Sequence, residues 1–359
     1  MEQVRVELGE RSYAIIIGSQ ILRRIGEELK TLDIGEKVGV VTNAKVGRLC
    51  GAITIRSLRE NGFEPAVFRV PDGEKYKNLN WAGRLYDHLV QKRFERSSAL
   101  IALGGGVIGD LTGFVAATYL RGIPFIQVPT TLVAQVDASI GGKTAVNHKR
   151  GKNLIGAFHQ PKLVYSDVGA LSTLSERDFR SGLAEVVKYG VIADENFFSF
   201  LEANTDRILK REPDSLLRAV KRSSEIKAEV VGQDERESGL RRILNYGHTI
   251  GHALETATGY RELTHGEAIS IGMVYAGRLA ERLGICGPEV VERQTALLRV
   301  FGLPVALPKI RPADILNCME LDKKVKDGKI HFVLADGIGH VSIQPVDRNE
   351  LKRLFLIRR

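Results

Sequence analysis

The sequence predicts an α/β protein with two domains, of which the first has a largely parallel sheet and the second is mainly helical. Up to about residue 167, short β-branched segments alternate with amphipathic helical segments, a pattern typical of a parallel sheet covered by helices. From residue 175 to about residue 300, long helical patterns follow one another with few strand signals. A length of 359 residues also exceeds what a single hydrophobic core usually organises.

The expected elements can be placed by residue number. In the first half we expect strands at residues 13–17, 37–42, 66–70, 99–103, 125–128 and 163–165, with helices at 21–30 and 80–92. In the second half we expect helices at 213–231 and 268–283, then a β-hairpin with strands 329–333 and 340–343 around a glycine-containing turn. The change of pattern near residue 171 predicts two domains, 1–171 and 172–359.

Composition and charge restrict the class of protein. The hydrophobic content of 43% and the charged content of 26% are ordinary for a soluble globular enzyme. The formal net charge is +9, but Lys and Arg are interleaved with acids, so we expect an anionic small-molecule substrate rather than nucleic acid. Three separated cysteines, no secretory signal pattern and no apolar run of membrane-spanning length predict a cytoplasmic protein that binds no membrane.

A glycine-rich turn follows one of the expected strands. Gly104, Gly106 and Gly109 satisfy the G-x-G-x-x-G pattern and precede a helical segment. Such a turn lets backbone N–H groups and a helix N-terminus approach a pyrophosphate, which favours a Rossmann-like nucleotide-binding domain. Two features depart from the usual pattern: the turn follows about the fourth strand, and the next strand ends in Pro129-Thr130-Thr131 without an acid for a ribose. The alternative is a tight packing turn.

Two lysines stand beside glycines in the region that follows. Lys143 lies in Gly-Gly-Lys-Thr and Lys152 lies in Gly-Lys-Asn. A flexible ammonium group where the backbone is accessible suits a phosphate or a carboxylate. The spacing is not that of a P-loop, so an NTPase is disfavoured. The alternative is two solvated lysines on a loop.

Four polar residues recur at helical spacing near the middle of the second half. Arg241, Asn245, His248 and His252 would form one stripe if residues 239–256 were a single helix, and its other positions are apolar or small. Such a stripe indicates a lined cavity with metal or acid/base chemistry. The Glu of H-E-x-x-H is absent after His248, so a metalloprotease is disfavoured.

The spacing leaves the metal ligands open. A third histidine, His265, opens the run His-Gly-Glu, and any two of the three histidines could bind metal. Core histidines satisfied by hydrogen bonds are the alternative. Glu185 and Lys188 share one face of an otherwise apolar helical segment, which favours a buried pair over an exposed one. Glu185 could then complete a zinc site of two imidazoles and one acid.

Several of these motifs occur together and in a fixed order. They are the glycine turn, Pro129-Thr130-Thr131, Gly141-Gly142-Lys143-Thr144, the 182–188 helix, Asn245-Tyr246-Gly247-His248 and His265-Gly266-Glu267. In this respect the chain resembles the 3-dehydroquinate synthase family of sugar-phosphate cyclases from about residue 72 to residue 324. The resemblance implies a homodimer with NAD and one divalent metal, zinc or cobalt, that converts 3-deoxy-D-arabino-heptulosonate 7-phosphate into 3-dehydroquinate and phosphate in the shikimate pathway.

The resemblance also implies roles for residues, by motif position. The metal ligands would be Glu185, His248 and His265, and His252 would contact substrate and transfer protons. Substrate binding and acid/base chemistry would involve Asp137, Lys143, Asn153, Lys188, Lys227, Glu237, Arg241, Asn245 and one of Lys323 and Lys324. Arg121 resembles an arginine that reaches the neighbouring subunit's site.

For NAD, the resemblance implies a set of residues in the first half of the chain. They are Asn43, Asp72, Gly73, Glu74, Lys77, Gly105, Gly106, Asp110, Thr130, Thr131, Lys143, Lys152 and Thr173. Val41 departs from the family pattern, because many relatives carry an aspartate there for the ribose hydroxyls. We therefore expect Asn43 or Glu74 to take over those contacts.

Two other enzymes and one non-enzyme stay as alternatives. Another sugar-phosphate cyclase would act on sedoheptulose 7-phosphate or glucose 6-phosphate, and it would lack several of the carboxylate-binding residues, which here are Lys227, Arg241, Asn245 and His252. A metal-dependent polyol dehydrogenase would combine a similar nucleotide domain with a helical metal domain, but it would produce NADH. A nucleotide-sensing or nucleic-acid-binding module would leave the polar stripe without a use.

Overall fold

The computed structural model describes residues 1–320, 325–326 and 329–356, so the expected substrate lysines Lys323 and Lys324 lie outside the described residues. The chain forms two compact units. The first comprises Met1–Leu174 and Leu216–Arg236, and the second comprises the described residues of Ser175–Ser215 and Glu237–Arg359. The first change of unit lies close to the expected boundary at residue 171. Residues 216–236, however, return to the first unit, which the sequence did not indicate.

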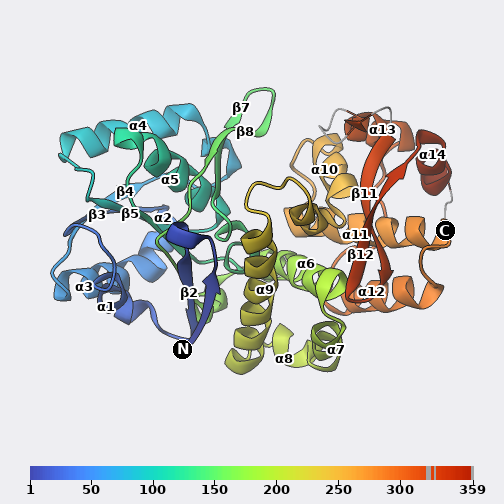
Figure 1. Cartoon of the computed structure of the whole chain (residues 1–359), viewed down its shortest axis with the longest axis horizontal. Coiled ribbons are helices and arrows are strands. Elements are labelled where there is room, and N and C mark those ends of the chain that lie inside the picture. The colour runs from blue at the N-terminus through green and yellow to red at the C-terminus, as the bar shows by residue number, and fades with distance from the viewer. Residues whose placement is uncertain (321–324, 327–328, 357–359) are drawn as a thin grey trace. The chain divides into compact units, whose positions relative to one another are not determined.

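The first unit is built on a seven-stranded sheet (Figure 1). Its strands are β1 (Glu2–Val6), β2 (Tyr13–Gly18), β3 (Lys37–Thr42), β4 (Glu64–Arg69), β5 (Ala99–Gly104), β6 (Phe125–Pro129) and β9 (Leu163–Asp167). The spatial order is β1-β2-β9-β6-β5-β3-β4, and every neighbouring pair is parallel except β1 and β2. The largely parallel sheet is therefore confirmed, and β1 adds an antiparallel edge strand that was not predicted.

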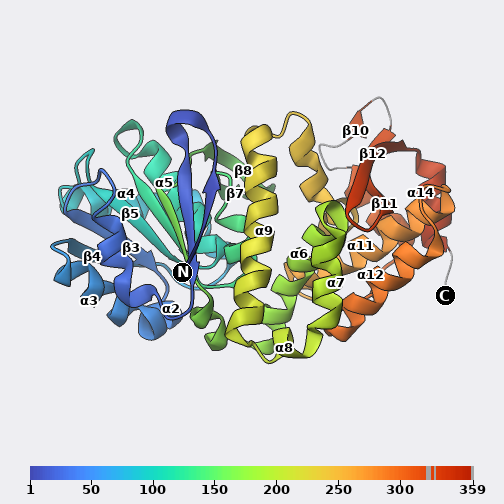
Figure 2. The same cartoon turned by 60° about the horizontal axis from the view of Figure 1, so that its bottom comes forward.

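Helices cover both faces of this sheet, and Figure 2 gives a second view of the arrangement. On one face lie α1 (Ile25–Leu29) and α3 (Ala52–Glu60), and on the other lie α4 (Leu79–Gln91) and α5 (Gly106–Thr118). The short α2 (Ala44–Val46) follows β3. Neighbouring residues of β3 enter different cores, since Val40 packs on the α1 and α3 side and Val41 on the α4 and α5 side. A strand buried on both faces has a continuous apolar sequence, which is why these strands were recognisable.

Residues 143–158 form an antiparallel hairpin that the sequence analysis did not predict. Its strands are β7 (Lys143–His148) and β8 (Gly151–Phe158), and they carry both glycine-flanked lysines. Glycines weaken the strand pattern in this sequence. At Gly156 a Cβ would lie 2.3 Å from the carbonyl oxygen of Thr144, so the close approach of the two strands requires glycine there.

The second unit is mainly helical (Figure 1). Its helices are α6 (Glu176–Ala193), α7 (Glu195–Ala203), α8 (Thr205–Leu209), α10 (His248–Ala257), α11 (His265–Arg282), α12 (Pro288–Val300), α13 (Pro312–Glu320) and α14 (Arg348–Leu356). The residues of α9 (Pro213–Gln233) are divided between the two units. A three-stranded antiparallel sheet is formed by β10 (Val325–Lys326), β11 (Lys329–Gly337) and β12 (His340–Val346). The predicted hairpin near the end of the chain is confirmed.

The single helix expected across residues 239–256 is wrong. The segment contains a 3₁₀ helix, η8 (Leu240–Asn245), and α10 then begins at His248. Between them Tyr246 has a ψ of 127°, and Gly247 has a φ of 75°, in the left-handed region that favours glycine. No continuous helical face therefore joins the expected stripe, and its four residues divide between two elements.

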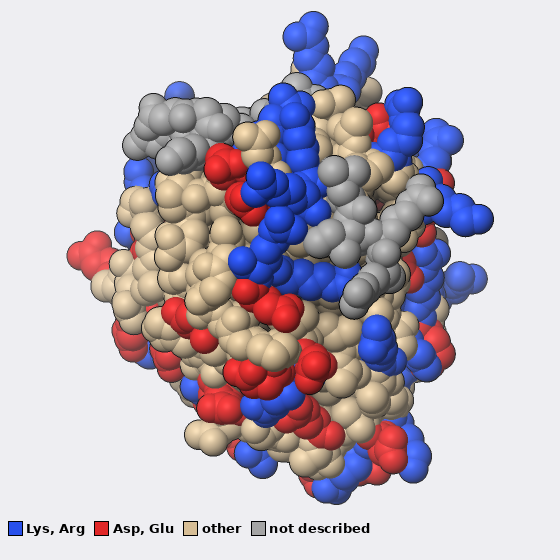
Figure 3. Space-filling model, turned by 90° about the vertical axis from the view of Figure 1, so that its right-hand side faces the viewer, with Lys and Arg blue, Asp and Glu red and all other residues tan. Residues whose placement is uncertain are grey.

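The surface and the helices bear on the expected partners. Among residues 1–320, 325–326 and 329–356, no helix is both long and apolar enough to cross a membrane. On the face shown in Figure 3, Lys and Arg side chains gather mainly in the upper half and Asp and Glu side chains mainly in the lower half. Both signs of charge are thus present on this face.

The contact between α10 and α11 generates a stability prediction. A Cβ at Gly272 would lie 2.0 Å from the carbonyl oxygen of Gly247, so the two helices approach through backbone. We expect Gly272→Ala to lower the free energy of unfolding by about 1–3 kcal/mol, because an overpacked helix pair must separate. A lower Tm in thermal unfolding followed by circular dichroism would be the result.

Gly83→Ala is the matched control. Gly83 lies inside α4, and a Cβ there would meet no atom within 4 Å. This substitution should keep or raise the Tm, because Ala is favoured over Gly in a helix by roughly 1 kcal/mol. An unchanged Tm for Gly272→Ala would contradict the close backbone contact.

Candidate active site

A buried ion pair on α6 forms the centre of the site in the second unit. The helix begins after Ser175, whose side chain accepts a hydrogen bond from the backbone N–H of Asp178. Glu185 and Lys188 follow one turn apart, with side chains 0% and 1% exposed, and their carboxylate and ammonium groups are paired. The buried pair expected from the apolar neighbours is confirmed, and the exposed alternative is wrong. A buried carboxylate needs such compensation, because burial of an isolated charge is costly.

His248 reaches this carboxylate from the first turn of α10. Its Nε2 lies 3.4 Å from Oε1 of Glu185, and its Nδ1 lies 3.0 Å from the carbonyl oxygen of Tyr246. Burial lowers the pKa of His248 well below its ordinary value, although the Glu185 carboxylate opposes that effect. The imidazole is therefore neutral near pH 7, which is the form that binds a metal.

His265 reaches the same carboxylate from the first residue of α11. A capping box formed by Thr264 and Glu267 begins this helix. The Nε2 of His265 lies 3.3 Å from Oε1 of Glu185, and its Nδ1 lies 3.5 Å from Oε2 of Glu255. Desolvation lowers the pKa of His265, but hydrogen bonds and charge from the two carboxylates outweigh it and raise the pKa to about 10.

These three residues fit a divalent metal. One carboxylate oxygen and two imidazole nitrogens, from Glu185, His248 and His265, all lie within 4.8 Å of one another. One acid and two histidines are a donor set of catalytic zinc sites, which keep an open position for substrate or water. A second group within the same distance limit consists of His252, Glu255 and His265. His265 belongs to both groups, because its two ring nitrogens face different carboxylates.

The remaining members of the expected stripe lie on different elements. His252 is one turn after His248 on α10, and its ring centroid lies 5.3 Å from that of His248 and 6.1 Å from that of His265. Asn245 is on η8, where its Nδ2 donates to Oε1 of Glu237 at 2.7 Å. Arg241, also on η8, is only 2% exposed. A charged side chain buried to this extent indicates a constructed polar environment, not a solvated surface.

Two groups near the histidines were missed by the sequence reasoning. Glu255 faces His265, and the backbone carbonyl of Tyr246 faces His248. One signal for Glu255 was available, since it stands three residues after His252 and shares its helical face. The Tyr246 carbonyl had no signal, because it is exposed to the ring only by the break between η8 and α10.

The glycine turn of the first unit has features that match both interpretations made from the sequence, a tight packing turn and a pyrophosphate cradle. A Cβ at Gly104 would lie 2.8 Å from Ile108, which is the packing role. A Cβ at Gly105 would lie 3.0 Å from Thr131, and Gly106 begins α5. Any larger residue at Gly105 would fill the space beside Thr131 and cover the start of α5. The turn thus has the small residues that a pyrophosphate cradle requires.

Lys77 connects several of the expected nucleotide and substrate residues. Its Nζ donates to Oδ2 of Asp110 at 2.9 Å and to Oδ1 of Asn153 at 2.7 Å, and it lies 3.2 Å from Oε1 of Glu74. Lys77 is only 4% exposed. Burial raises the pKa of Asp110, and the nearby Lys77 ammonium opposes that rise. Asn153 lies in β8 and has a φ of 55°, so the unpredicted hairpin contributes to this cluster.

Other expected residues of the first unit form smaller groups. Nζ of Lys227 donates to Oδ1 of Asp137 at 2.6 Å and to its carbonyl oxygen at 2.7 Å. Nδ2 of Asn43 donates to Oδ1 of Asp72 at 3.2 Å, while its Oδ1 caps α2. Val41 is fully buried in the core, and the polar side chains at this strand end are those of Thr42 and Asn43.

The other expected residues of this unit lie in turns, in the β7–β8 hairpin or at the surface. Thr131 Oγ1 accepts from the N–H of Ala134, and Thr173 Oγ1 donates to the carbonyl oxygen of Ala170, both within their own turns. Lys143 and Arg121 are exposed. Thr130 donates its N–H to the carbonyl oxygen of Gly104, Gly73 has a φ of 117°, and Lys152 is half-buried in β8.

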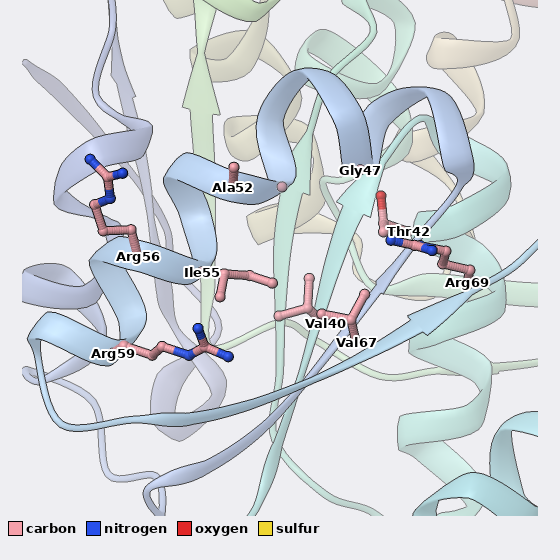
Figure 4. Close-up of a pocket in the computed structure, with 10 residues that line it drawn as sticks. Val40, Thr42, Gly47, Ala52, Ile55, Arg56, Arg59, Val67 and Arg69 are labelled. Atoms are coloured by element: carbon pink, nitrogen blue, oxygen red, sulfur yellow. The ribbon is translucent and has the colours of Figure 1, made fainter.

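A cavity elsewhere in the first unit contains none of the expected site residues. It has a volume of about 520 Å³ and is lined by Val40, Thr42, Gly47, Gly51, Ala52, Ile55, Arg56, Arg59, Val67 and Arg69. Figure 4 shows these side chains between α3 and the strands β3 and β4. The candidate site is therefore identified from the chemistry of its residues and not from this cavity.

The opposite pKa shifts of the two histidines generate a prediction for the metal-free protein. His265 should stay protonated until about pH 10, while His248 should be neutral at pH 6.5. Because the folded pKa of His265 is raised above the ordinary 6.5, its stabilising contribution is complete below pH 6.5 and is lost as the pH rises toward 10. NMR titration of the imidazole rings, assigned with His248→Ala and His265→Ala, measures both values. Glu185→Gln should lower the pKa of His265, and an ordinary pKa near 6.5 in the unaltered protein would contradict this account.

Comparisons with known proteins show the family of this chain. Residues 67–181 match the model of the 3-dehydroquinate synthase N-terminal family, and residues 182–325 match that of the 3-dehydroquinate synthase C-terminal family. The chain is 55% identical over 357 residues to the 3-dehydroquinate synthase of Thermodesulfovibrio yellowstonii, covering 99% of both chains.

Two solved structures share the fold over nearly the whole chain. A 2-deoxy-scyllo-inosose synthase complexed with carbaglucose-6-phosphate, NAD⁺ and Co²⁺ is 26% identical, with a TM-score of 0.91 over 98% of this chain and 99% of that chain. A 2-epi-5-epi-valiolone synthase from Streptomyces hygroscopicus with NAD⁺ and Zn²⁺ bound is 29% identical, with a TM-score of 0.89 over 97% of each chain. The chain belongs to the 3-dehydroquinate synthase family.

Proposed function

We propose that this enzyme converts 3-deoxy-D-arabino-heptulosonate 7-phosphate into 3-dehydroquinate and phosphate, a step of the shikimate pathway. The observation that carries the proposal is the convergence of Glu185, His248 and His265 in a chain that is 55% identical to a 3-dehydroquinate synthase. The reaction combines oxidation, phosphate elimination, re-reduction and an intramolecular aldol addition. NAD is therefore regenerated within each turnover.

We assign the divalent metal, zinc or cobalt, to Glu185, His248 and His265. When bound, the metal would polarise two neighbouring hydroxyls of the substrate and lower the cost of alkoxide character. The two imidazoles present Nε2 toward the shared carboxylate, so all three donors face one position. The proximity of Lys188 to Glu185 adds a positive charge that suits an anionic substrate.

We assign NAD to the first unit, where it would accept a hydride from the substrate and return it. The glycine turn and the start of α5 would receive the pyrophosphate. The proposed contacts are Asn43, Asp72, Gly73, Glu74, Lys77, Gly105, Gly106, Asp110, Thr130, Thr131, Lys143, Lys152 and Thr173. The cluster around Lys77 supports this assignment, because three of these residues are already joined by short polar contacts there.

The remaining residues would bind substrate and move protons. Basic, amide and acidic side chains would hold the phosphate, carboxylate and hydroxyls of the substrate. They are Lys143, Lys188, Lys227, Arg241, Asn153, Asn245 and Asp137. His252 would transfer protons, and Glu237 would be a second acid/base group. Residues that hold each intermediate in the orientation needed for the next step lower the entropy cost of that step. One site can therefore carry out the whole series of reactions.

We further propose that the protein is a cytoplasmic homodimer. Arg121 is exposed and has a φ of 69°, so it is held in an uncommon backbone conformation at the end of a short 3₁₀ segment. An arginine presented in this way suits a role in the partner's site.

The second candidate reaction is that of another sugar-phosphate cyclase, which the similarity to the 2-deoxy-scyllo-inosose synthase supports. The retained set of Arg241, Asn245, Lys227 and His252 favours the heptulosonate.

One assay separates these functions. The purified protein is incubated with the heptulosonate phosphate, NAD⁺ and Zn²⁺, while phosphate release and NADH absorbance are followed together. We expect stoichiometric phosphate without accumulating NADH, and loss of phosphate release after metal removal by a chelator. Accumulating NADH without phosphate would point to a polyol dehydrogenase. Phosphate release only from sedoheptulose 7-phosphate or glucose 6-phosphate would point to the other cyclases.

Substitutions of two histidines test the division of roles on α10 and α11. His265→Ala should lose bound zinc and turnover together, because it removes a ligand. His252→Ala should keep zinc and lower kcat by roughly 10²–10⁴-fold, the usual contribution of a proton-transfer group. Metal content by atomic spectroscopy and turnover by phosphate release measure both effects. An active, metal-replete His265→Ala variant, or a zinc-free His252→Ala variant, would reverse the assignment.

A further inference from the structure

We infer that Glu255 is a positioning residue that holds the His265 imidazole with its Nε2 toward the metal position. This inference rests on the proposed function, because it concerns the same metal site. Glu255 has no role in the residue set implied by the family resemblance. Its carboxylate faces Nδ1 of His265, whereas Nε2 of the same ring faces Glu185.

The two nitrogens of His265 face two different carboxylates. Nε2 lies 3.3 Å from Oε1 of Glu185, and Nδ1 lies 3.5 Å from Oε2 of Glu255. A neutral imidazole carries one N–H, and the group that accepts its hydrogen bond decides which nitrogen keeps the lone pair. When Glu255 accepts from Nδ1–H, the Nε2 lone pair of His265 is available to a metal.

His248 has the same arrangement with a different acceptor. Its Nε2 lies 3.4 Å from Oε1 of Glu185, and its Nδ1 lies 3.0 Å from the carbonyl oxygen of Tyr246. Both histidines thus present Nε2 to one carboxylate oxygen and Nδ1 to an acceptor. This is the arrangement in which an outer partner orients a metal-binding histidine and raises its basicity. The Tyr246 carbonyl oxygen is the acceptor for the His248 ring, and the Glu255 carboxylate is the acceptor for the His265 ring.

His265 needs such a partner more than His248 does. The His248 side chain is 10% exposed and is therefore held by packing, whereas the His265 side chain is 34% exposed. The capping box holds the backbone around His265 through Thr264 and Glu267 and involves no atom of the His265 ring. Glu255 is only 6% exposed and lies on the neighbouring helix α10, so it offers a well-packed acceptor.

Glu255 as a direct ligand is the competing assignment. His252, Glu255 and His265 also bring ligand atoms within 4.8 Å of one another. That group would use Nδ1 of His265 and would leave the buried Glu185 carboxylate without a metal. The Glu185 group is favoured because both Nε2 atoms approach the same oxygen of a fully buried acid.

Metal binding to the purified full-length protein tests the inference without substrate. The metal-free protein is titrated with Zn²⁺ against a chromophoric chelator, and the visible spectrum is recorded with Co²⁺. The variants are Glu255→Gln, which keeps an acceptor of the same shape, and Glu255→Met, which removes it. We expect zinc affinity to fall roughly tenfold in the first and roughly a hundredfold in the second, with a shifted but retained Co²⁺ spectrum, because outer partners of metal-binding histidines have effects of this size.

Glu267→Gln is the matched control. Glu267 lies two residues from His265 and makes an ion pair with Arg177, and Gln also serves in a capping box. This variant should bind Zn²⁺ as the unaltered protein does. Far-ultraviolet circular dichroism and the Tm of each metal-free variant report folding. If Glu255→Met does not fold, the isosteric Glu255→Gln and its Co²⁺ spectrum carry the test.

Each remaining outcome has a distinct meaning. Unchanged affinity and an unchanged Co²⁺ spectrum in both Glu255 variants would overturn the positioning role while leaving the proposed function intact. Zinc binding that survives Glu185→Gln but is abolished by Glu255→Gln would make Glu255 a ligand, and this too would overturn the positioning role. An unaltered protein that binds no Zn²⁺ would refute the metal site and with it the inference. A graded loss of metal binding in a protein that does not act on the heptulosonate phosphate would refute only the proposed substrate.

Discussion

The fully buried carboxylate of Glu185 is the constraint on which the second unit depends. An acid with no solvent exposure must be matched by positive charge or hydrogen-bond donors, since isolated burial is costly. Lys188 meets this need from the same helix and the protonated His265 meets it from α11, whereas the neutral His248 turns the lone pair of its Nε2 toward the carboxylate. The three helices can approach through glycine: a Cβ at Gly266 would lie 1.8 Å from the carbonyl oxygen of Ser181. Glycine at the helix contacts is therefore part of the site.

The break before α10 has chemical as well as geometric consequences. In a continuous helix, the carbonyl of Tyr246 would accept the backbone N–H four residues later. Because the chain turns at Gly247, that oxygen accepts a hydrogen bond from Nδ1–H of His248 instead. The same break places Arg241 and Asn245 on a separate 3₁₀ segment. The proposed ligand His248, the carbonyl that faces it and two expected substrate residues thus depend on one residue with positive φ.

Buried pairs of a lysine and an acid recur in both units. Lys77 pairs with Asp110, Lys227 pairs with Asp137, and Lys188 pairs with Glu185. Each lysine is at most 6% exposed, so its charge is little screened by water. Because each pair joins one cation to one anion, these pairs contribute no net charge, and the basic surplus of the composition comes from other residues.

The sequence by itself determined the parallel sheet and the later helices, because apolar periodicity is local in the chain. Its spacing left the metal ligands open, and Glu185, His248 and His265 were predicted from ordered motifs shared with a known family. It also determined the family through those motifs. Tertiary structure alone decided the β7–β8 hairpin, the break at Gly247 and the contact of Glu255 with His265. It also decided the pairs of Lys77 with Asp110 and of Lys227 with Asp137, which are 33 and 90 residues apart. The physical reason is that periodicity reports which face of an element is buried, whereas the partner of a buried charge is set by packing between distant segments.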